Sequence, residues 1–149
     1  MTSLMIIEDG DEYLRFFSRY ITNYAYHQAH SMQACLEFFD SGASIEGFVL
    51  DLRFDRVPHT DLIGDVEQMA GAMFGGDLDA AQRYIVDNQG YLILKELRQR
   101  GHQQPALLVA DLPMRRQENL RKLYGRIGVV QSFDKGRITA ALKELVVQT

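Results

Sequence analysis

Short apolar runs alternate along the chain with longer segments whose apolar residues recur every three or four positions. The short runs are typical of buried strands, and the longer segments have the spacing of one helix face. The predicted strands are Ser3–Ile7, Ala25–His30, Gly47–Leu50, Pro105–Val109 and Gly128–Phe133. The predicted helices are Asp11–Tyr24, a helix that begins after a Ser31 cap, Gly90–Arg100, Leu112–Tyr124 and Ile138–Val147.

This pattern is a strand followed by a helix, repeated five times, and it predicts an α/β fold. Alternating strands and helices form a parallel sheet with helices on both faces, and right-handed crossovers leave few topologies. One of the commonest is the flavodoxin-like strand order 2-1-3-4-5, with a ligand crevice at the carboxyl ends of the strands. We therefore expect a flavodoxin-like (βα)5 three-layer sandwich that forms a single domain over residues 1–149.

Residues 55–89 form a connection much longer than the few residues that usually join a strand to the next helix. Leu62–Phe74 and Leu78–Val86 both have helical spacing, and Gly75 and Gly76 separate them. Asp77 stands where the second segment needs a helix cap. We expect a helical hairpin, inserted between the third strand and the third helix beside the crevice.

Carboxylates stand at the ends of two predicted strands. Glu8 and Asp9 end the first strand and Asp51 ends the third, so neighbouring first and third strands would gather all three at one edge of the sheet. Clustered carboxylates raise one another's pKa unless a cation joins them, and Mg²⁺ prefers such oxygen ligands. A carboxylate beside Mg²⁺ can accept a phosphoryl group. Lys135, just past the fifth strand, would pair with the phosphoryl oxygens or with Asp51.

Each of these residues also has a simpler interpretation. Taken alone, Glu8 and Asp9 are a solvated strand end or the cap of the next helix. Lys135 is then a surface lysine that opens the last helix. Asp111 is most simply the cap of the helix that starts at Leu112. The functional interpretation therefore depends on several roles converging on one place.

Composition and charge narrow the classes of function. The sequence is 46% apolar and 24% charged, with no apolar run long enough to span a membrane and no pattern of a secretion signal at its start. The single cysteine, Cys35, favours a reducing cytoplasm. A net charge of −4 argues against direct nucleic-acid binding. Residues 111–149 nevertheless carry 8 Lys/Arg against 4 Asp/Glu, a charge distribution of either solvated helix faces or a partner-facing surface.

In their order along the chain, the segments resemble the receiver domains of response regulators. LMIIEDGDEYLRFF resembles the first strand and acidic pair of that family, and YHQAHSMQACLEFF its second strand and helix. FVLDLRF resembles the segment with the phosphorylated aspartate, and GYLILKELRQRG with PALLVA resembles the third helix and fourth strand. GVVQSFDK resembles the last strand and its lysine. The resemblance covers nearly the whole chain except the insertion.

The resemblance implies a role for each residue of the acidic site. By it, Glu8 and Asp9 are Mg²⁺ ligands, and Asp11 is a possible substitute because the EDGD run leaves the acidic pair ambiguous. The remaining implied roles are the phosphoacceptor at Asp51, a metal-binding backbone carbonyl at Arg53 and the phosphate-binding lysine at Lys135.

Three departures from the family's pattern affect the switch. Ala110, followed by Asp111, stands where a Ser or Thr hydroxyl would hydrogen-bond the phosphoryl group. Gly136 replaces the proline that follows the lysine, and Ser132 stands at the position of the aromatic switch residue in the last strand. In the family, activation couples the hydroxyl after the fourth strand to the aromatic residue in the last strand. These departures and the insertion favour a module that keeps the fold without the chemistry.

Two functions therefore compete, and neither is enzymatic beyond self-phosphorylation and autodephosphorylation. In the first, a histidine kinase or phosphotransfer protein phosphorylates Asp51 with Mg²⁺, and the domain signals through protein contacts. The surface for these protein contacts would be the fourth helix, fifth strand and fifth helix, or the insertion. The partner would be another protein or, in a homodimer, a second copy of the chain. In the second, the chain is a phosphorylation-independent pseudo-receiver that acts as an adaptor. A metal-dependent phosphohydrolase is weaker, because Arg53 occupies the place of its second acid.

Overall fold

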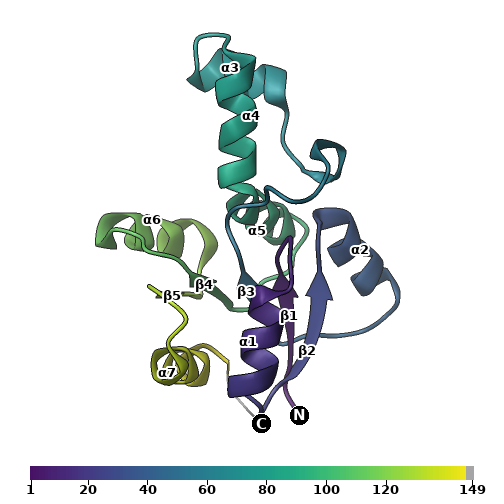
Figure 1. Ribbon diagram of the computed structural model, residues 1–149, viewed down its shortest axis with the longest axis vertical. Helices are drawn as coiled ribbons and strands as arrows, with labels where there is room; N and C mark the ends of the chain where they lie inside the picture. Colours follow the sequence, from purple (N-terminus) through teal and green to yellow (C-terminus); the bar gives the residue numbers. More distant parts are fainter. Residues whose placement is uncertain (147–149) are drawn as a thin grey trace.

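Five parallel strands form the centre of the molecule in the computed structural model, which describes residues 1–146. Their order in the sheet is β2-β1-β3-β4-β5, which confirms the predicted flavodoxin-like order (Figure 1). The strands are β1 (Ser3–Ile7), β2 (Ala25–Ala29), β3 (Gly47–Leu50), β4 (Ala106–Val109) and β5 (Ile127–Val130). β1 and β3 are direct neighbours, so the first and third strands end side by side.

Helices cover both faces of the sheet because successive strand residues point to opposite faces. Leu4 and Ile6 of β1 pack with the first and last helices, whereas Met5 and Ile7 belong to the core on the other face. The first face is covered by α1 (Glu12–Tyr20) and α7 (Lys135–Leu145). The second is covered by α2 (Met32–Asp40), α5 (Gln89–Gln99) and α6 (Met114–Tyr124).

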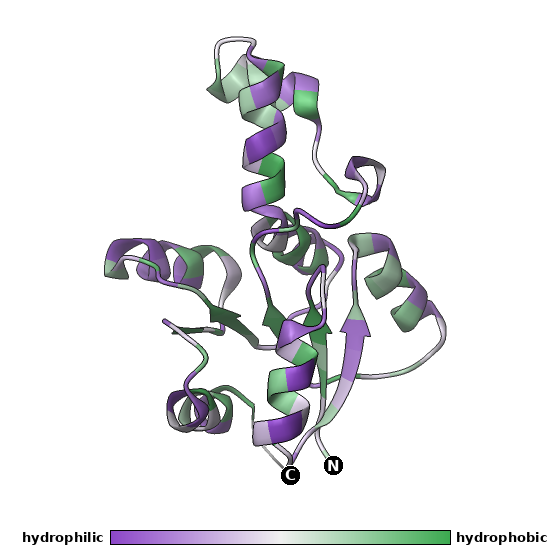
Figure 2. Cartoon of the chain, viewed as in Figure 1, coloured by the Kyte–Doolittle hydropathy of each residue, from purple (hydrophilic) through white to green (hydrophobic). Residues whose placement is uncertain are grey.

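Hydropathy follows this layering. The central strands are buried along nearly their whole length, as expected for parallel strands covered on both faces. The edge strand β2 is only partly buried, and Figure 2 shows its hydrophilic residues beside the apolar β1. No helix in the described part of the chain is long and apolar enough to cross a membrane.

The predicted insertion is a helical hairpin. A short turn, η1 (His59–Asp61), leads into α3 (Val66–Met73) and α4 (Leu78–Asp87), and Asp77 caps α4 as expected by accepting from Ala80 N–H at 3.1 Å. Only one residue separates α4 from α5. The hairpin therefore extends from the start of α5, and Figure 1 shows it projecting beyond the body formed by the sheet and its covering helices.

The base of the hairpin is held by a buried glutamine. Gln89 is fully buried, and its side-chain amide pairs with both backbone groups of Ile63, accepting from the N–H at 2.9 Å and donating to the carbonyl at 3.0 Å. A buried amide paired in this way replaces the water that the Ile63 backbone would otherwise need. The loop before α3 is thus fixed to the first turn of α5.

Several predicted boundaries shift, and those near the carboxyl edge affect the site. β5 ends at Val130 rather than Phe133, because its sole neighbour β4 ends at Val109 and offers no further ladder partners. α6 begins at Met114 after Pro113, so Asp111 is not its cap. The last helix begins three residues earlier than predicted, at Lys135. The prediction that it reaches Val147 lies outside the described residues.

Candidate functional site

Two strand ends bring the predicted carboxylates together. Ile7 of β1 pairs with Leu50 of β3, so Glu8 and Asp51 follow the paired strands at the same edge of the sheet. The Asp51 N–H continues the ladder by donating to the Ile7 carbonyl at 2.9 Å. This is the edge at which a flavodoxin-like sheet forms its ligand crevice.

A close approach of α5 fixes the backbone around Asp51. The N–H of Gly90 donates to the Leu52 carbonyl at 3.0 Å. A Cβ atom at position 90 would lie 2.2 Å from the Asp51 carbonyl oxygen and 2.9 Å from the Leu52 Cα. Only glycine fits this contact, because backbone atoms on both sides cannot move apart cheaply. The glycine therefore sets the position of the aspartate relative to α5.

Asp9 joins the end of β1 to the loop after β3. It is 9% exposed, and its Oδ2 accepts from the backbone N–H groups of Asp55 at 2.9 Å and Arg56 at 3.0 Å. Hydrogen bonds from N–H groups to a carboxylate are charge-assisted and hold it in place. The loop that carries Asp51 is thus tied to the acidic pair.

Asp51 has a strongly perturbed acidity. Burial raises its pKa to about 6, and the negative charges of Asp9 and Glu8 act in the same direction, while backbone hydrogen bonds from Arg53 and Leu52 oppose them. The negative charges of Asp9 and Asp51 repel each other until a cation neutralises them. The oxygen donors Asp9 and Asp51 fit a hard divalent ion such as Mg²⁺.

The carboxylates alone do not complete a metal centre. Among residues 1–146, no group of three or more His, Cys, Asp and Glu side chains is arranged to hold a metal ion. A cation between Asp9 and Asp51 would thus take its other ligands from water, phosphate and backbone carbonyls, as Mg²⁺ commonly does. Asp11 is exposed, and its Oδ1 accepts from Gln28 Nε2 at 3.4 Å.

Glu8 has a structural task at this edge. It is fully buried, and its two carboxylate oxygens accept from the N–H groups of Tyr13 and Leu14, both at 2.9 Å. Asp11, the residue before α1, makes no capping hydrogen bond through its side chain. Glu8 therefore satisfies two of the free N–H groups at the start of α1. Burial raises the pKa of Glu8 despite these hydrogen bonds.

The side chain of Arg53 turns away from the acidic cluster. It is exposed, and its Nε lies 3.5 Å from Asp55 and 3.4 Å from Asp87, the last residue of α4. The backbone, by contrast, stays at the site, since its N–H contacts Asp51. Any metal contact at this position would come from the main chain, as the sequence resemblance implied.

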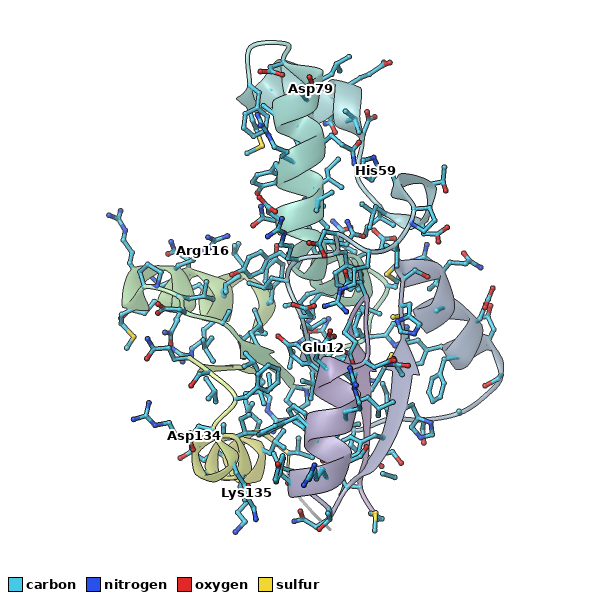
Figure 3. All side chains as sticks on the ribbon, viewed as in Figure 1. Glu12, His59, Asp79, Arg116, Asp134 and Lys135 are labelled. Carbon is cyan, nitrogen blue, oxygen red and sulfur yellow. The ribbon has the colours of Figure 1, made fainter. Side chains whose placement is uncertain are left out.

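The structure does not bring Lys135 to the acidic cluster. It is an exposed residue in the first turn of α7, whose N-terminus is capped by Asp134 through a 3.0 Å hydrogen bond from Arg137 N–H. In Figure 3, Lys135 is well separated from Glu12, which opens α1 beside the site. The cause is the early end of β5: the residue that follows the strand directly is Gln131. The charges that act most strongly on Asp51 are Asp9 and Glu8.

Of the two predicted switch positions, Ala110 directly follows β4 as expected, whereas Ser132 lies outside β5. Ala110 directly follows β4 and is half-buried, with its N–H donating to the Val130 carbonyl at 2.9 Å. Ser132 is exposed and lies two residues beyond β5, so it is not a residue of the last strand as predicted. β5 itself reads IGVV and holds no aromatic side chain.

Tyr13 is a site residue that the sequence reasoning missed. It is 7% exposed, and its hydroxyl lies 3.1 Å from the Val109 carbonyl oxygen and 3.5 Å from Asp51 Oδ1. Burial raises the pKa of this hydroxyl, and the charge of Asp51 adds to the effect, so the proton stays on the oxygen at neutral pH. The available signal was an aromatic residue with a polar tip in the first turn after the acidic pair.

Comparisons with known proteins agree with this architecture. No protein-family model matches the sequence, and no curated protein matches it. The response regulator TrrA of Thermotoga maritima, solved with Mg²⁺-BeF, has a TM-score of 0.62 and 14% identity over 98% of this chain and 100% of that chain. The chemotaxis protein CheY4 of Vibrio cholerae has a TM-score of 0.63 and 14% identity over 98% and 99%.

A third structure, the BeF3-activated receiver domain of DrrB, has a TM-score of 0.59 and 12% identity over 97% of both chains. The chain has the fold of a receiver domain. This receiver fold extends over nearly all of the sequence, and the acidic edge described above is the carboxyl edge of its parallel sheet.

Proposed function

We propose that the chain is a receiver-like signalling domain that accepts a phosphoryl group on Asp51 with Mg²⁺ bound. The observation that carries the proposal is the half-buried Asp51 beside the buried Asp9, with a pKa raised to about 6 by burial and by its acidic neighbours. Such a pair is electrostatically unfavourable alone and suited to a divalent cation and a phosphoryl group.

Each residue then has a defined task. Asp9 and Asp51 would hold Mg²⁺ with the backbone carbonyl of Arg53, while Glu8 adds negative charge and fixes the start of α1. The bound ion would neutralise charge on the phosphoryl oxygens during transfer. An Asp51 oxygen attacks phosphorus, the bond to the donor nitrogen of a phosphohistidine breaks, and the departing imidazole takes up a proton.

Similar structures support the choice of ion and of a phosphoryl group as the ligand. TrrA was solved with Mg²⁺-BeF and DrrB was activated with BeF3. A histidine kinase or a phosphotransfer protein is accordingly the proposed source of the phosphoryl group, acting in the cytoplasm. Lys135 stays a proposed phosphate ligand only if α7 moves, because the structure holds it exposed on that helix.

The output surface that we propose is the face formed by α6, β5 and α7, or the hairpin. A cleft of about 390 Å³ lies on this face, with Leu112, Gln117, Val129, Arg137 and Glu144 among its lining residues. Such a cleft suits a protein partner or a second copy of the chain, and the basic residues of α6 would steer association.

Intact mass spectrometry tests the proposal. The protein is incubated with acetyl phosphate and Mg²⁺, alongside Asp51→Asn and the control Asp11→Asn, an exposed acid of the β1–α1 loop. We expect a gain of one phosphoryl group in the wild type and the control, none in Asp51→Asn, and none after chelation of Mg²⁺. Absence of the adduct from the wild type would overturn the proposal.

A phosphorylation-independent adaptor is the second candidate. Ala110 offers no hydroxyl, Lys135 lies on a helix surface and the oxygens of Glu8 already bind α1. These observations favour a retained fold without phosphoryl chemistry. An adaptor of this kind need not bind Mg²⁺, so a melting temperature that Mg²⁺ leaves unchanged would favour it over the first proposal.

A further inference from the structure

A side-chain hydroxyl of α1 reaches Asp51. Tyr13 has one proton and two acceptors within reach: the Val109 carbonyl at 3.1 Å and Asp51 Oδ1 at 3.5 Å. The first is a normal hydrogen-bond length and the second is at the limit. The hydroxyl is therefore held by the end of β4 while it faces the aspartate.

The backbone of Tyr13 is fixed as firmly as its tip. Its N–H donates to Glu8 Oε1 at 2.9 Å, so the acidic pair itself positions this residue. The ring is buried in the core formed by α1, α7 and the sheet. Such a donor loses little conformational freedom when it changes acceptor.

We propose that Tyr13 donates its hydroxyl proton to the phosphoryl group on Asp51, and that it supplies the side-chain hydroxyl that position 110 lacks. A phosphoryl group bonded to Asp51 places its own oxygens near an O–H that now faces the Asp51 carboxylate. An anionic phosphoryl oxygen is a stronger acceptor than the Val109 carbonyl. The hydrogen bond donated by the Tyr13 hydroxyl therefore shifts from the Val109 carbonyl to the phosphoryl group. This inference rests on the proposed function of Asp51.

Aromatic contacts connect Tyr13, and thus its change of hydrogen-bond partner, to the surface of the molecule. The Tyr13 ring meets Phe133 edge-on with centroids 4.8 Å apart, and Phe133 also lies 5.0 Å from the ring of Phe16. Phe133 belongs to the loop between β5 and α7 and is 42% exposed. A change in the tilt of Tyr13 therefore reaches the β5–α7 loop, which a partner can contact.

Binding of Mg²⁺ and of beryllofluoride, measured separately, tests this role. The variants are Tyr13→Phe and the control Tyr24→Phe, which removes a hydroxyl from another buried tyrosine that has no hydrogen-bond partner among the described residues. We expect Tyr13→Phe to keep the Mg²⁺ affinity of the wild type and to bind beryllofluoride about tenfold or more weakly. Tyr24→Phe should match the wild type in both.

The outcomes separate the two proposals. A wild type that binds no beryllofluoride in Mg²⁺ overturns the proposed function and this inference with it. A Tyr13→Phe variant that binds beryllofluoride as tightly as the wild type overturns the inference alone, and so does an equal loss of Mg²⁺ affinity, which indicates a structural role. As a second readout, beryllofluoride should shift the Phe133 backbone amide resonance in the wild type and much less in Tyr13→Phe; an equal shift would overturn the route to the loop.

Discussion

At Asp51, burial and negative charge act in the same direction. Both favour the protonated carboxylic acid in the folded protein, so its pKa is about 6. In the unfolded chain the pKa of an aspartate is near 3.9. The folded state thus binds more protons than the unfolded state between about pH 4 and pH 6, and stability falls as the pH rises through this window.

This sign gives a prediction for Asp51→Asn without metal. At pH 8 the substitution should raise the free energy of unfolding by about 1–2 kcal/mol, after allowance for the partial exposure of the site. At pH 4.5 the gain should largely vanish, since the native aspartate is then protonated. Urea unfolding in chelator at both values measures it. The exposed Asp111→Asn is the control for loss of one negative charge, and an equal gain from Asp51→Asn at both pH values would contradict the account.

A second prediction for a single residue concerns Gly90. Gly90→Ala would place a Cβ against the Asp51 and Leu52 backbone, so we expect a loss of about 3 kcal/mol in unfolding free energy. The matched control is Gly71→Ala in α3, where a Cβ meets nothing within 4 Å and helix propensity should add about 0.5–1 kcal/mol. Chemical denaturation compares them. A Gly90→Ala variant with the unfolding free energy of the wild type would show that α5 does not pack tightly against the backbone of Asp51.

Among the elements, the hairpin of α3 and α4 stands out because its base depends on few groups. Gln89 pairs with both backbone groups of Ile63, and α4 runs into α5 with one residue between. The tip exposes Met73 and Leu78, and the two helices pack mainly on each other. The insertion is therefore expected to open locally before the sheet unfolds.

Removal of the Gln89 amide tests this dependence. Gln89→Leu keeps the buried volume and leaves the Ile63 N–H and carbonyl without partners, at a cost of about 2–4 kcal/mol. Hydrogen exchange should accelerate in residues 59–87 and change little in β1 and β3. Gln33→Leu, on the exposed side of α2, is the control and should leave exchange unaltered. Uniform acceleration across the sheet would show that the hairpin does not open independently.

For the whole molecule, the sequence predicted the architecture well and the site in part. Five apolar runs and their helices determine the strand order, because parallel strands must be covered on both faces. The gathering of Glu8, Asp9 and Asp51 also follows, since it needs only that β1 and β3 be neighbours. These features depend on patterns that extend over many residues.

What could not be predicted depends on single positions and on tertiary contacts. The end of β5 is set by the length of β4, and a shift of a few residues moved Lys135 onto α7 and Ser132 into a loop. Tyr13 meets Asp51 only because α1 packs across the sheet, which spacing does not encode. The helix cap was an alternative to the acidic-site role of Glu8, and only the geometry reveals that its carboxylate binds the start of α1 while it lies in the acidic cluster.

The most direct test of the central claim locates the phosphoryl group on the chain. After incubation with acetyl phosphate and Mg²⁺, borohydride reduces an aspartyl phosphate to homoserine, and tandem mass spectrometry of the peptides identifies the altered residue. The account predicts homoserine at position 51 and unmodified aspartate at Asp9, Asp11 and Asp55. Homoserine at another position, or at none, would contradict it.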